Sequence, residues 1–212
     1  MTVTSAPALR AARGLADLDD TEFGARLLAS APVHQGRGHG VLRAWAAAAA
    51  EFGAALPSAP PPAARVVERE GGLALGMLAR YRSRPATVEL YTDAIAAAED
   101  LVERLGWRAL YPAGSVRAAA LAHEAVHEQL HHGGGKAELR RAVGHLVLSC
   151  GRLRVYGYVA GAEEIAAHAY AARAAGLGRS PLLLAEALAA TTAPPLPAGA
   201  EAPRAPHARR KK

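Results

Sequence analysis

The sequence predicts an α+β fold that is mostly helical, with a small, largely antiparallel sheet of about three strands packed on helices. The chain has 212 residues, of which 51% are hydrophobic, and many of these are Ala, a strong helix former. Long segments repeat apolar residues with helical spacing, whereas residues 65–91 hold short runs that alternate as strands do. This length is enough to bury one good core.

The N-terminal part is expected to be a small helical lobe followed by a linker, over residues 1–62. Its expected elements are, in order, a loose segment (1–16), an amphipathic helix (17–30), a Gly-rich loop (34–40), a helix (41–52) and a Pro-rich linker (56–62). Phe23, Leu27 and Leu28 fall on one side of the first helix. The run of prolines at the end of this part predicts a boundary with the body of the protein.

The body is expected to span residues 63–190. Its expected strands are 65–70, 73–82 and 86–91, with Gly71-Gly72 as a hairpin turn, and 155–159 is either a loop or a short strand. Its expected helices are 93–105, 115–132, 137–148, 163–177 and 181–190. Ser180-Pro181 fits the N-cap and first position of the last helix. Proline and basic residues predict a disordered basic tail over 191–212.

The charge distribution and the cysteine content indicate which partners and which compartment to expect. The net charge is +6, but Glu201 and five Arg or Lys residues in 201–212 contribute +4 of it. The body is therefore almost neutral, and no specific nucleic-acid binding is expected beyond weak contact through the tail. Cys150 is the only cysteine, so no intrachain disulfide forms, which fits a reducing compartment. Without a secretory leader or an apolar run long enough for a membrane, the sequence predicts a cytoplasmic protein.

The stretch His-Glu-Ala-Val-His, residues 123–127, is the most informative motif of the chain. In a helix, four steps return His127 to nearly the same face as His123, about 6 Å further along the axis. Two imidazoles in this arrangement can bind one metal ion, with Glu124 beside the metal as a general base. At these residue frequencies the pattern is expected about 0.02 times by chance. The motif predicts a zinc-dependent hydrolase.

A catalytic zinc site usually needs a third protein ligand and one open position. The sequence offers a carboxylate on the expected helix over 163–177, which reads Glu-Ile-Ala-Ala-His-Ala-Tyr-Ala from Glu164. Glu164 and His168 are four residues apart and share a helical face. Glu164 is the candidate ligand, and its neighbour Glu163 is the alternative, one helical step away.

These two motifs together resemble the ImmA/IrrE-type metallopeptidases, a gluzincin group. The resemblance covers roughly residues 65–178 and implies a zincin-like core holding one Zn²⁺ ion. It assigns His123 and His127 as imidazole ligands, Glu164 as the carboxylate ligand and Glu124 as the general base. The chain departs from the family at Val126, where the family usually has Gly. The resemblance also implies a peptide or protein substrate, such as a transcriptional regulator.

The implied reaction is metal-assisted hydrolysis of a peptide bond. Zinc lowers the pKa of a bound water to about 7, and Glu124 passes the proton to the leaving amine. The developing oxyanion needs a second donor, for which Tyr156, Tyr158 and His168 are all candidates. His168 is alternatively a group that orients Glu164, a fourth ligand, or part of a polar helix face. An edge strand at 87–91 is expected to hold an extended peptide by strand addition.

Two other functions stay open. The chain could be a non-catalytic metal-binding module for protein interaction or regulation with the same fold, or a helical nucleic-acid-associated protein that uses its tail. Several further residues are expected to have structural roles. Trp45 and Trp107 are expected to anchor the core or a lobe interface, and His145 to be buried or at an interface. Cys150 is expected to be an inert core thiol, and His131 and His132 to lie on the surface near a helix end.

Overall fold

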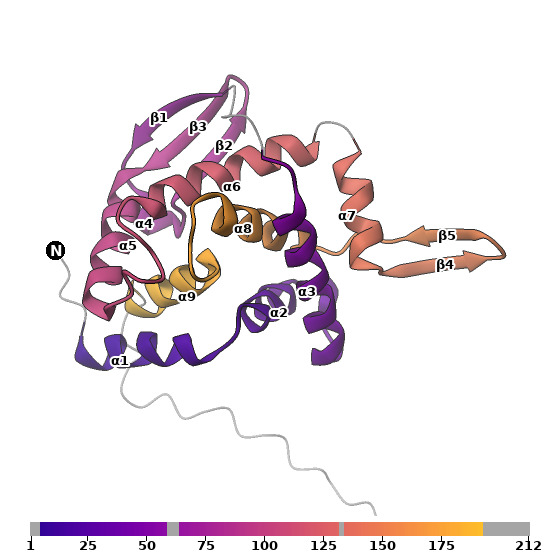
Figure 1. Ribbon diagram of the computed structural model, residues 1–212, viewed down its shortest axis with the longest axis horizontal. Helices are drawn as coiled ribbons and strands as arrows, with labels where there is room; N and C mark the ends of the chain where they lie inside the picture. Colours follow the sequence, from indigo (N-terminus) through magenta and orange to yellow (C-terminus); the bar gives the residue numbers. More distant parts are fainter. Residues whose placement is uncertain (1–4, 59–63, 132–133, 193–212) are drawn as a thin grey trace, which may run out of the picture.

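The computed structural model describes residues 5–58, 64–131 and 134–192. It confirms a mixed, mostly helical α+β fold (Figure 1). A three-stranded sheet covers one corner of the molecule, and a two-stranded hairpin projects from another part of it. None of the described helices combines the length and apolar character that a membrane crossing needs.

The N-terminal helices are α1 (Ala6–Gly14), η1 (Leu15–Asp17), α2 (Asp20–Ser30), η2 (Pro32–His34) and α3 (His39–Ala55). The two helices expected at 17–30 and 41–52 are confirmed as α2 and α3. The expectation of a loose segment over 1–16 is wrong from residue 6 onward. The Ser5 hydroxyl accepts a hydrogen bond from the Ala8 amide, and Ala12 is fully buried against the C-terminal part of the chain. The Ser5 cap and the packing of Ala12 on residues of the C-terminal part therefore stabilise α1.

The sheet consists of β1 (Arg65–Arg69), β2 (Ala79–Ser83) and β3 (Ala86–Tyr91), with α4 (Gly72–Leu75) between the first two. Its order is β1-β3-β2, so the expected hairpin between the first two strands is wrong. β1 pairs parallel with β3, and only β2 pairs antiparallel with it, so the sheet is mixed rather than largely antiparallel. Gly71, at φ 98°, precedes α4, whose first amides donate to the Asp93 carboxylate. The Gly-Gly pair therefore begins a helical turn.

This topology makes β3 the central strand and β2 an edge strand, so the expected edge strand over 87–91 is wrong. Glu89 of β3 is nearly buried at 8% exposure, and it joins the neighbouring strands through arginines. Arg80 of β2 lies 2.8 Å from its carboxylate, and Arg69 of β1 lies 3.9 Å away. The arginine contacts hold the pKa of Glu89 below its usual value, Arg80 contributing most. The free edge of β2 is left facing the helices.

The remaining elements are α5 (Thr92–Leu105), α6 (Ser115–His131), α7 (Gly135–Val143), β4 (Leu146–Cys150), β5 (Leu153–Tyr156), α8 (Ala162–Ala174) and α9 (Pro181–Thr192). All the helices expected here are present, but the one expected over 137–148 ends at Val143. Gly144, at φ 74°, ends it in a conformation that favours glycine. The expected linker over 56–62 is described only as far as residue 58, and α9 continues to Thr192, beyond which the expected tail over 191–212 lies outside the described residues.

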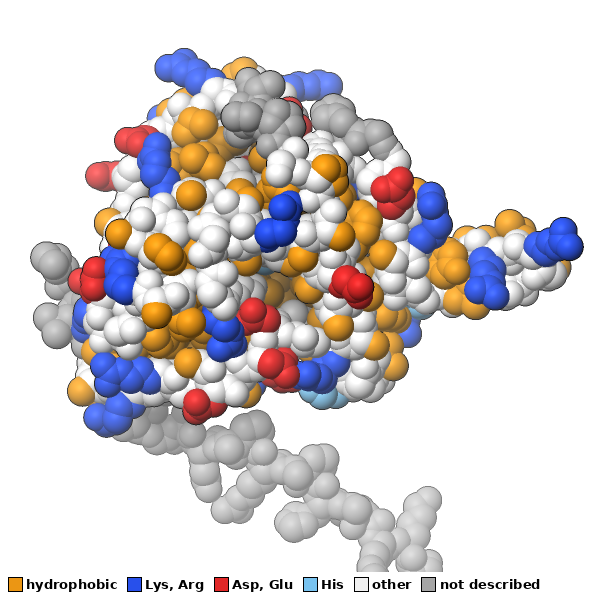
Figure 2. Space-filling model, in the orientation of Figure 1, with side chains coloured by type: hydrophobic (Ala, Val, Ile, Leu, Met, Phe, Trp, Pro, Cys, Tyr) orange, Lys and Arg blue, Asp and Glu red, His pale blue; other side chains and the backbone are white. Residues whose placement is uncertain are grey.

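The β4–β5 hairpin projects from the body and carries apolar side chains on its surface (Figure 2). Its register pairs Leu148 with Val155 and Cys150 with Leu153, which brings these four side chains to one face. Cys150 is an exposed free thiol, so its expected place in the core is wrong. Nearly all residues of both strands are exposed, so no described element covers this face.

Helix α8 occupies the centre of the helical layer, between α3 and α6 (Figure 1). Gly53 of α3 lies directly against the backbone of Ala166, which is fully buried. Ala167 of α8 shares an apolar cluster with Val126 and Leu130 of α6. Because α3 packs on α8 and α1 packs on α9, the N-terminal helices share the main core. A separate lobe over residues 1–62 stays a prediction.

Both tryptophans are buried, as expected, each with 7% exposure. The Trp45 ring lies 4.8 Å from the ring of His145 and 5.7 Å from that of His34, which confirms His145 as a packed, partly buried histidine. The Trp107 ring lies 6.3 Å from the Tyr111 ring, and both residues belong to a core cluster formed with residues of α5 and α9. The structure describes the backbone of His131 but not its side chain, and His132 lies outside the described residues.

We expect Gly53→Ala to destabilise the protein by about 3 kcal/mol, because overpacking of a tight contact forces the backbone to move. The new Cβ would lie 2.0 Å from the Ala166 carbonyl oxygen. Gly40, near the start of the same helix, has open space around it, so Gly40→Ala is a matched control that should be neutral or stabilising. Thermal unfolding of both variants checks this, and equal melting temperatures would contradict the described contact.

Candidate metal centre

Helix α6 carries three of the predicted site residues on adjoining faces. Val126 and Leu130 are buried and attach the helix to α8. His123 and His127, one turn apart, are partly buried beside this contact, with 14% and 18% of their side chains exposed. Their rings lie 4.8 Å apart between centroids. The apolar face of α6 thus fixes the direction in which both imidazoles point.

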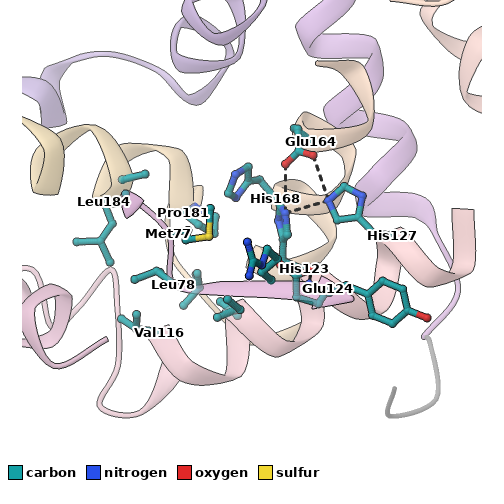
Figure 3. A pocket seen from close by; sticks show the side chains of 18 of the residues that line it. Met77, Leu78, Val116, His123, Glu124, His127, Glu164, His168, Pro181 and Leu184 are labelled. Carbon is teal, nitrogen blue, oxygen red and sulfur yellow. Dashed lines mark hydrogen bonds and ion pairs between the residues drawn. The ribbon is translucent and has the colours of Figure 1, made fainter. Parts of the chain in front are cut away.

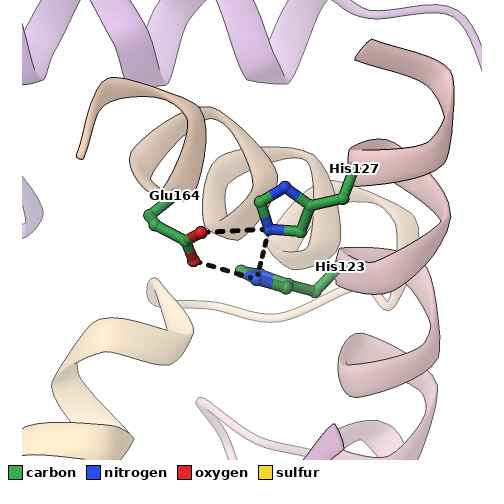
Figure 4. Close-up of side chains that lie close together, drawn as sticks. All are labelled: His123, His127 and Glu164. Carbon is green, nitrogen blue, oxygen red and sulfur yellow. Dashed lines mark hydrogen bonds and ion pairs between the residues drawn. The ribbon is translucent and has the colours of Figure 1, made fainter. Parts of the chain in front are cut away.

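Helix α8 supplies the carboxylate in its first turn. Glu164 Oε1 lies 3.2 Å from His127 Nε2, and Glu164 Oε2 lies 3.3 Å from His123 Nε2 (Figure 4). Glu163, the alternative ligand, instead forms an ion pair with Lys136 at 3.2 Å. The structure therefore brings Glu164, rather than Glu163, to the two histidines.

The side chains of His123, His127 and Glu164 form a small triangle of possible metal ligands. The two Nε2 atoms are 3.1 Å apart, and each lies 3.2–3.3 Å from a different oxygen of Glu164. Ligands held at 2.0–2.1 Å by a tetrahedral ion are about 3.3 Å from one another. The two nitrogens are spaced as two corners of such a tetrahedron, and one ligand atom from each of the three residues lies within 4.8 Å of the others. His123, His127 and Glu164 could therefore hold a metal ion.

The three groups also perturb one another's protonation. The hydrogen bonds from His123 and then His127 hold the pKa of Glu164 far below its usual value of 4.5. Desolvation is the largest single effect on His127 and lowers its pKa, but Glu164 and the nearby Glu124 outweigh it. The net result is a pKa of His127 above its usual 6.5. Without a metal ion, a proton on the imidazole pair is favoured by the carboxylate.

Glu124 lies next to this triangle and is nearly buried, with 8% exposure. Its Oε2 accepts a hydrogen bond of 2.8 Å from the backbone amide of Tyr81 on β2. A backbone donor on the edge strand thus orients the acid beside the metal ligands. Sequence reasoning missed Tyr81, because a main-chain amide has no residue signature.

The three candidates for an oxyanion donor differ in whether they line the cleft. His168 lines the cleft with its ring 4.4 Å from that of His123. Burial, and next the charge of His123, hold the pKa of His168 well below 6.5. Tyr156 lies in the projecting hairpin opposite Leu146, and Tyr158 lies beside the guanidinium of Arg140. Of the three candidates, the cleft is lined by His168 and by neither tyrosine, so the structure brings only His168 to the metal-binding residues.

The triangle opens into a cleft of about 1030 Å³ between β2, α6, α8 and α9 (Figure 3). His123, Glu124, His127, Glu164 and His168 all line it. A volume of this size is at the upper end of the range for ligand sites, about 300–1,000 Å³. The chemically active groups are therefore open to a sizeable ligand.

No family model, curated protein or solved structure matches this chain.

We expect His123→Ala, His127→Ala and Glu164→Ala each to weaken zinc binding at least about 100-fold, since each removes one of three ligands. Glu163→Ala, next to Glu164 on the same helix, is the matched control and should bind zinc as the wild type does. Competition with a chromophoric chelator measures these affinities. Equal affinity of the Glu163 and Glu164 variants would contradict the assigned ligand.

Protons should compete with the metal for His127. Its pKa in the folded protein lies above 6.5, and only the unprotonated Nε2 can bind a cation. The affinity for zinc should therefore rise as the pH increases through this pKa, and should fall by about tenfold per unit below it. Chelator competition between pH 5.5 and 8 checks the sign. An affinity that is flat across this range would show that the imidazoles are not ligands.

Proposed function

We propose that this chain is a zinc-dependent metallopeptidase that hydrolyses a peptide bond in a peptide or protein substrate. One observation carries the proposal. Two imidazole nitrogens that lie 3.1 Å apart each lie 3.2–3.3 Å from an oxygen of a carboxylate on a separate helix, beside a buried glutamate and at the wall of a large cleft. Two imidazoles and one carboxylate suit zinc among the common divalent ions, and leave a fourth position for water or substrate.

A bound zinc ion would supply a Lewis acid for the scissile carbonyl and lower the pKa of a water molecule towards neutrality. The chain itself supplies the proton transfer. Glu124 accepts the proton of the attacking water and returns it to the leaving amine nitrogen. Because the Tyr81 amide already donates to Oε2, this role falls to Oε1.

His168 can stabilise the negative charge that develops on the oxygen of the scissile carbonyl. Its lowered pKa keeps the ring neutral near pH 7, and a neutral imidazole still carries one N–H donor. Its Nδ1 is buried and has no hydrogen-bond partner among the described residues. A neutral donor at the wall of the cleft would stabilise an oxyanion without competing with the metal for the carboxylate.

The edge strand beside the site supports an extended peptide substrate. The Leu78 carbonyl accepts from the Tyr91 amide of β3, so the alternate residues Ala79 and Tyr81 direct their backbone groups to the free edge. The Tyr81 amide is used by Glu124, and the groups of Ala79 remain for a substrate. A peptide laid along this edge would pass the metal ligands.

The resemblance to the ImmA/IrrE-type metallopeptidases is also part of the proposal. An edge strand, a helix with His-Glu-x-x-His and a later helix with the proposed third ligand support the proposal of a zincin-like core. We propose membership of the ImmA/IrrE-type group on this basis, with a transcriptional regulator as a candidate substrate. The proposal includes a cytoplasmic setting, where an exposed thiol such as Cys150 stays reduced.

Glu124→Gln should retain zinc but lose peptide cleavage by at least about 100-fold, since general-base catalysis contributes roughly that much or more. Glu128→Gln, one turn further along α6 and also at the cleft, is the matched control and should stay active. The assay follows cleavage of dye-quenched casein and of a mixed peptide library by the zinc-loaded proteins.

Zinc content must be measured on each sample, so that lost activity is not lost metal. If the wild type and the Glu124→Gln variant both bind zinc and neither cleaves any peptide, the non-catalytic binding module is the better account.

A further inference from the structure

The cleft is chemically divided along its length. At one end lie the metal ligands, Glu124 and His168 (Figure 3). The other end is lined by apolar side chains that come from the approach to β2, the first turn of α6 and the start of α9: Met77, Leu78, Val116, Pro181 and Leu184. This end has no role in the hydrolytic chemistry proposed above.

Helix α6 gives the distance between the two ends. Ala120 and Ala119 line the cleft one turn before His123, and Val116 lines it two turns before. At 1.5 Å per residue, the apolar wall extends about 5–10 Å from the metal ligands. An extended peptide advances about 3.3 Å per residue, so this distance corresponds to about one to three residues.

The polar side chains of Tyr111 and Arg80, near the apolar end, already have partners. The Tyr111 hydroxyl donates to the Ser180 carbonyl oxygen at 2.8 Å, and Arg80 holds Glu89 on the sheet. A polar substrate side chain entering here would lose water and gain no hydrogen bond from these groups. Alanines on the α6 side of the cleft leave room for a large side chain.

We propose that the apolar end binds a large aliphatic or aromatic side chain of the substrate, one to three residues from the scissile bond. This inference rests on the proposed peptidase function and adds the class of residue that the cleft selects. Met77, Leu78 and Leu184 form the binding surface, and the metal ligands fix its distance from the reacting bond. An apolar side chain should be preferred over a polar one at that position by about tenfold or more.

Peptide hydroxamates test this without any cleavage, because the hydroxamate chelates zinc and so marks the position of the reacting carbonyl. In the first series the hydroxamate is at the C-terminus of the peptide. One residue of the peptide, placed one, two or three positions from the hydroxamate, is Leu, Phe, Asn or Lys, and all others are Gly. A second series carries the hydroxamate on an N-terminal succinyl group, which extends the peptide to the other side. Binding to the zinc-loaded full chain is measured by calorimetry.

The matched variants are Met77→Glu and Leu75→Glu. Met77 lines the cleft, whereas Leu75 is 53% exposed on α4 and does not line it. We expect the wild type and the Leu75 variant to prefer Leu and Phe over Asn by about tenfold at one position in one series. Met77→Glu should reduce this preference at least fivefold while leaving zinc affinity unchanged.

Equal binding of Leu, Phe, Asn and Lys at every position would overturn the inference, as would a Met77 variant that behaves like the Leu75 variant. Failure of every hydroxamate to bind the zinc-loaded chain would also overturn it. A failure of the proposed function looks different: the preference for Leu and Phe would persist in binding, while no peptide would be cleaved.

Discussion

The close packing of α8 between α3 and α6 is the constraint on which the site depends. On one side Gly53 admits the backbone of Ala166, and on the other Ala167 joins the cluster of Val126 and Leu130. At these two contacts α8 presents only alanine, so the helices approach closely enough for the side chains of α6 and α8 to meet between them. The Glu164 carboxylate therefore reaches both imidazoles of α6. A larger residue at either contact would separate the ligands.

The sheet adds a second constraint by holding Glu124 from the opposite side of α6. The mixed order β1-β3-β2 leaves β2 at the edge, and its Tyr81 amide binds the carboxylate directly. The same strand contributes to the walls of the cleft. The proposed general base, the proposed peptide-binding edge and part of the apolar end thus depend on one strand pairing correctly with β3, and the arginines around Glu89 reinforce this pairing.

The sequence predicted what depends on helical periodicity. His123 and His127 fall on one face because four residues make about one turn, and Glu164 was recognised from the pattern of its own helix. The sequence did not predict what depends on distant partners. Gly71-Gly72 suits a hairpin turn as well as the start of α4, and only the parallel pairing of β1 decides between them. The apolar residues from Leu146 to Leu148 fit the end of the helix expected over 137–148, and they do not reveal that 146–150 forms an exposed strand.

X-ray absorption at the zinc edge of the loaded wild-type chain tests the central claim most directly. We expect one zinc per chain with four near neighbours at about 2.0–2.1 Å, two of them showing the outer-shell scattering of imidazole. Glu164→Gln should change the oxygen shell and keep both imidazoles. A shell of six oxygens without imidazole scattering, or a spectrum unchanged in the Glu164 variant, would contradict a metal centre built from α6 and α8.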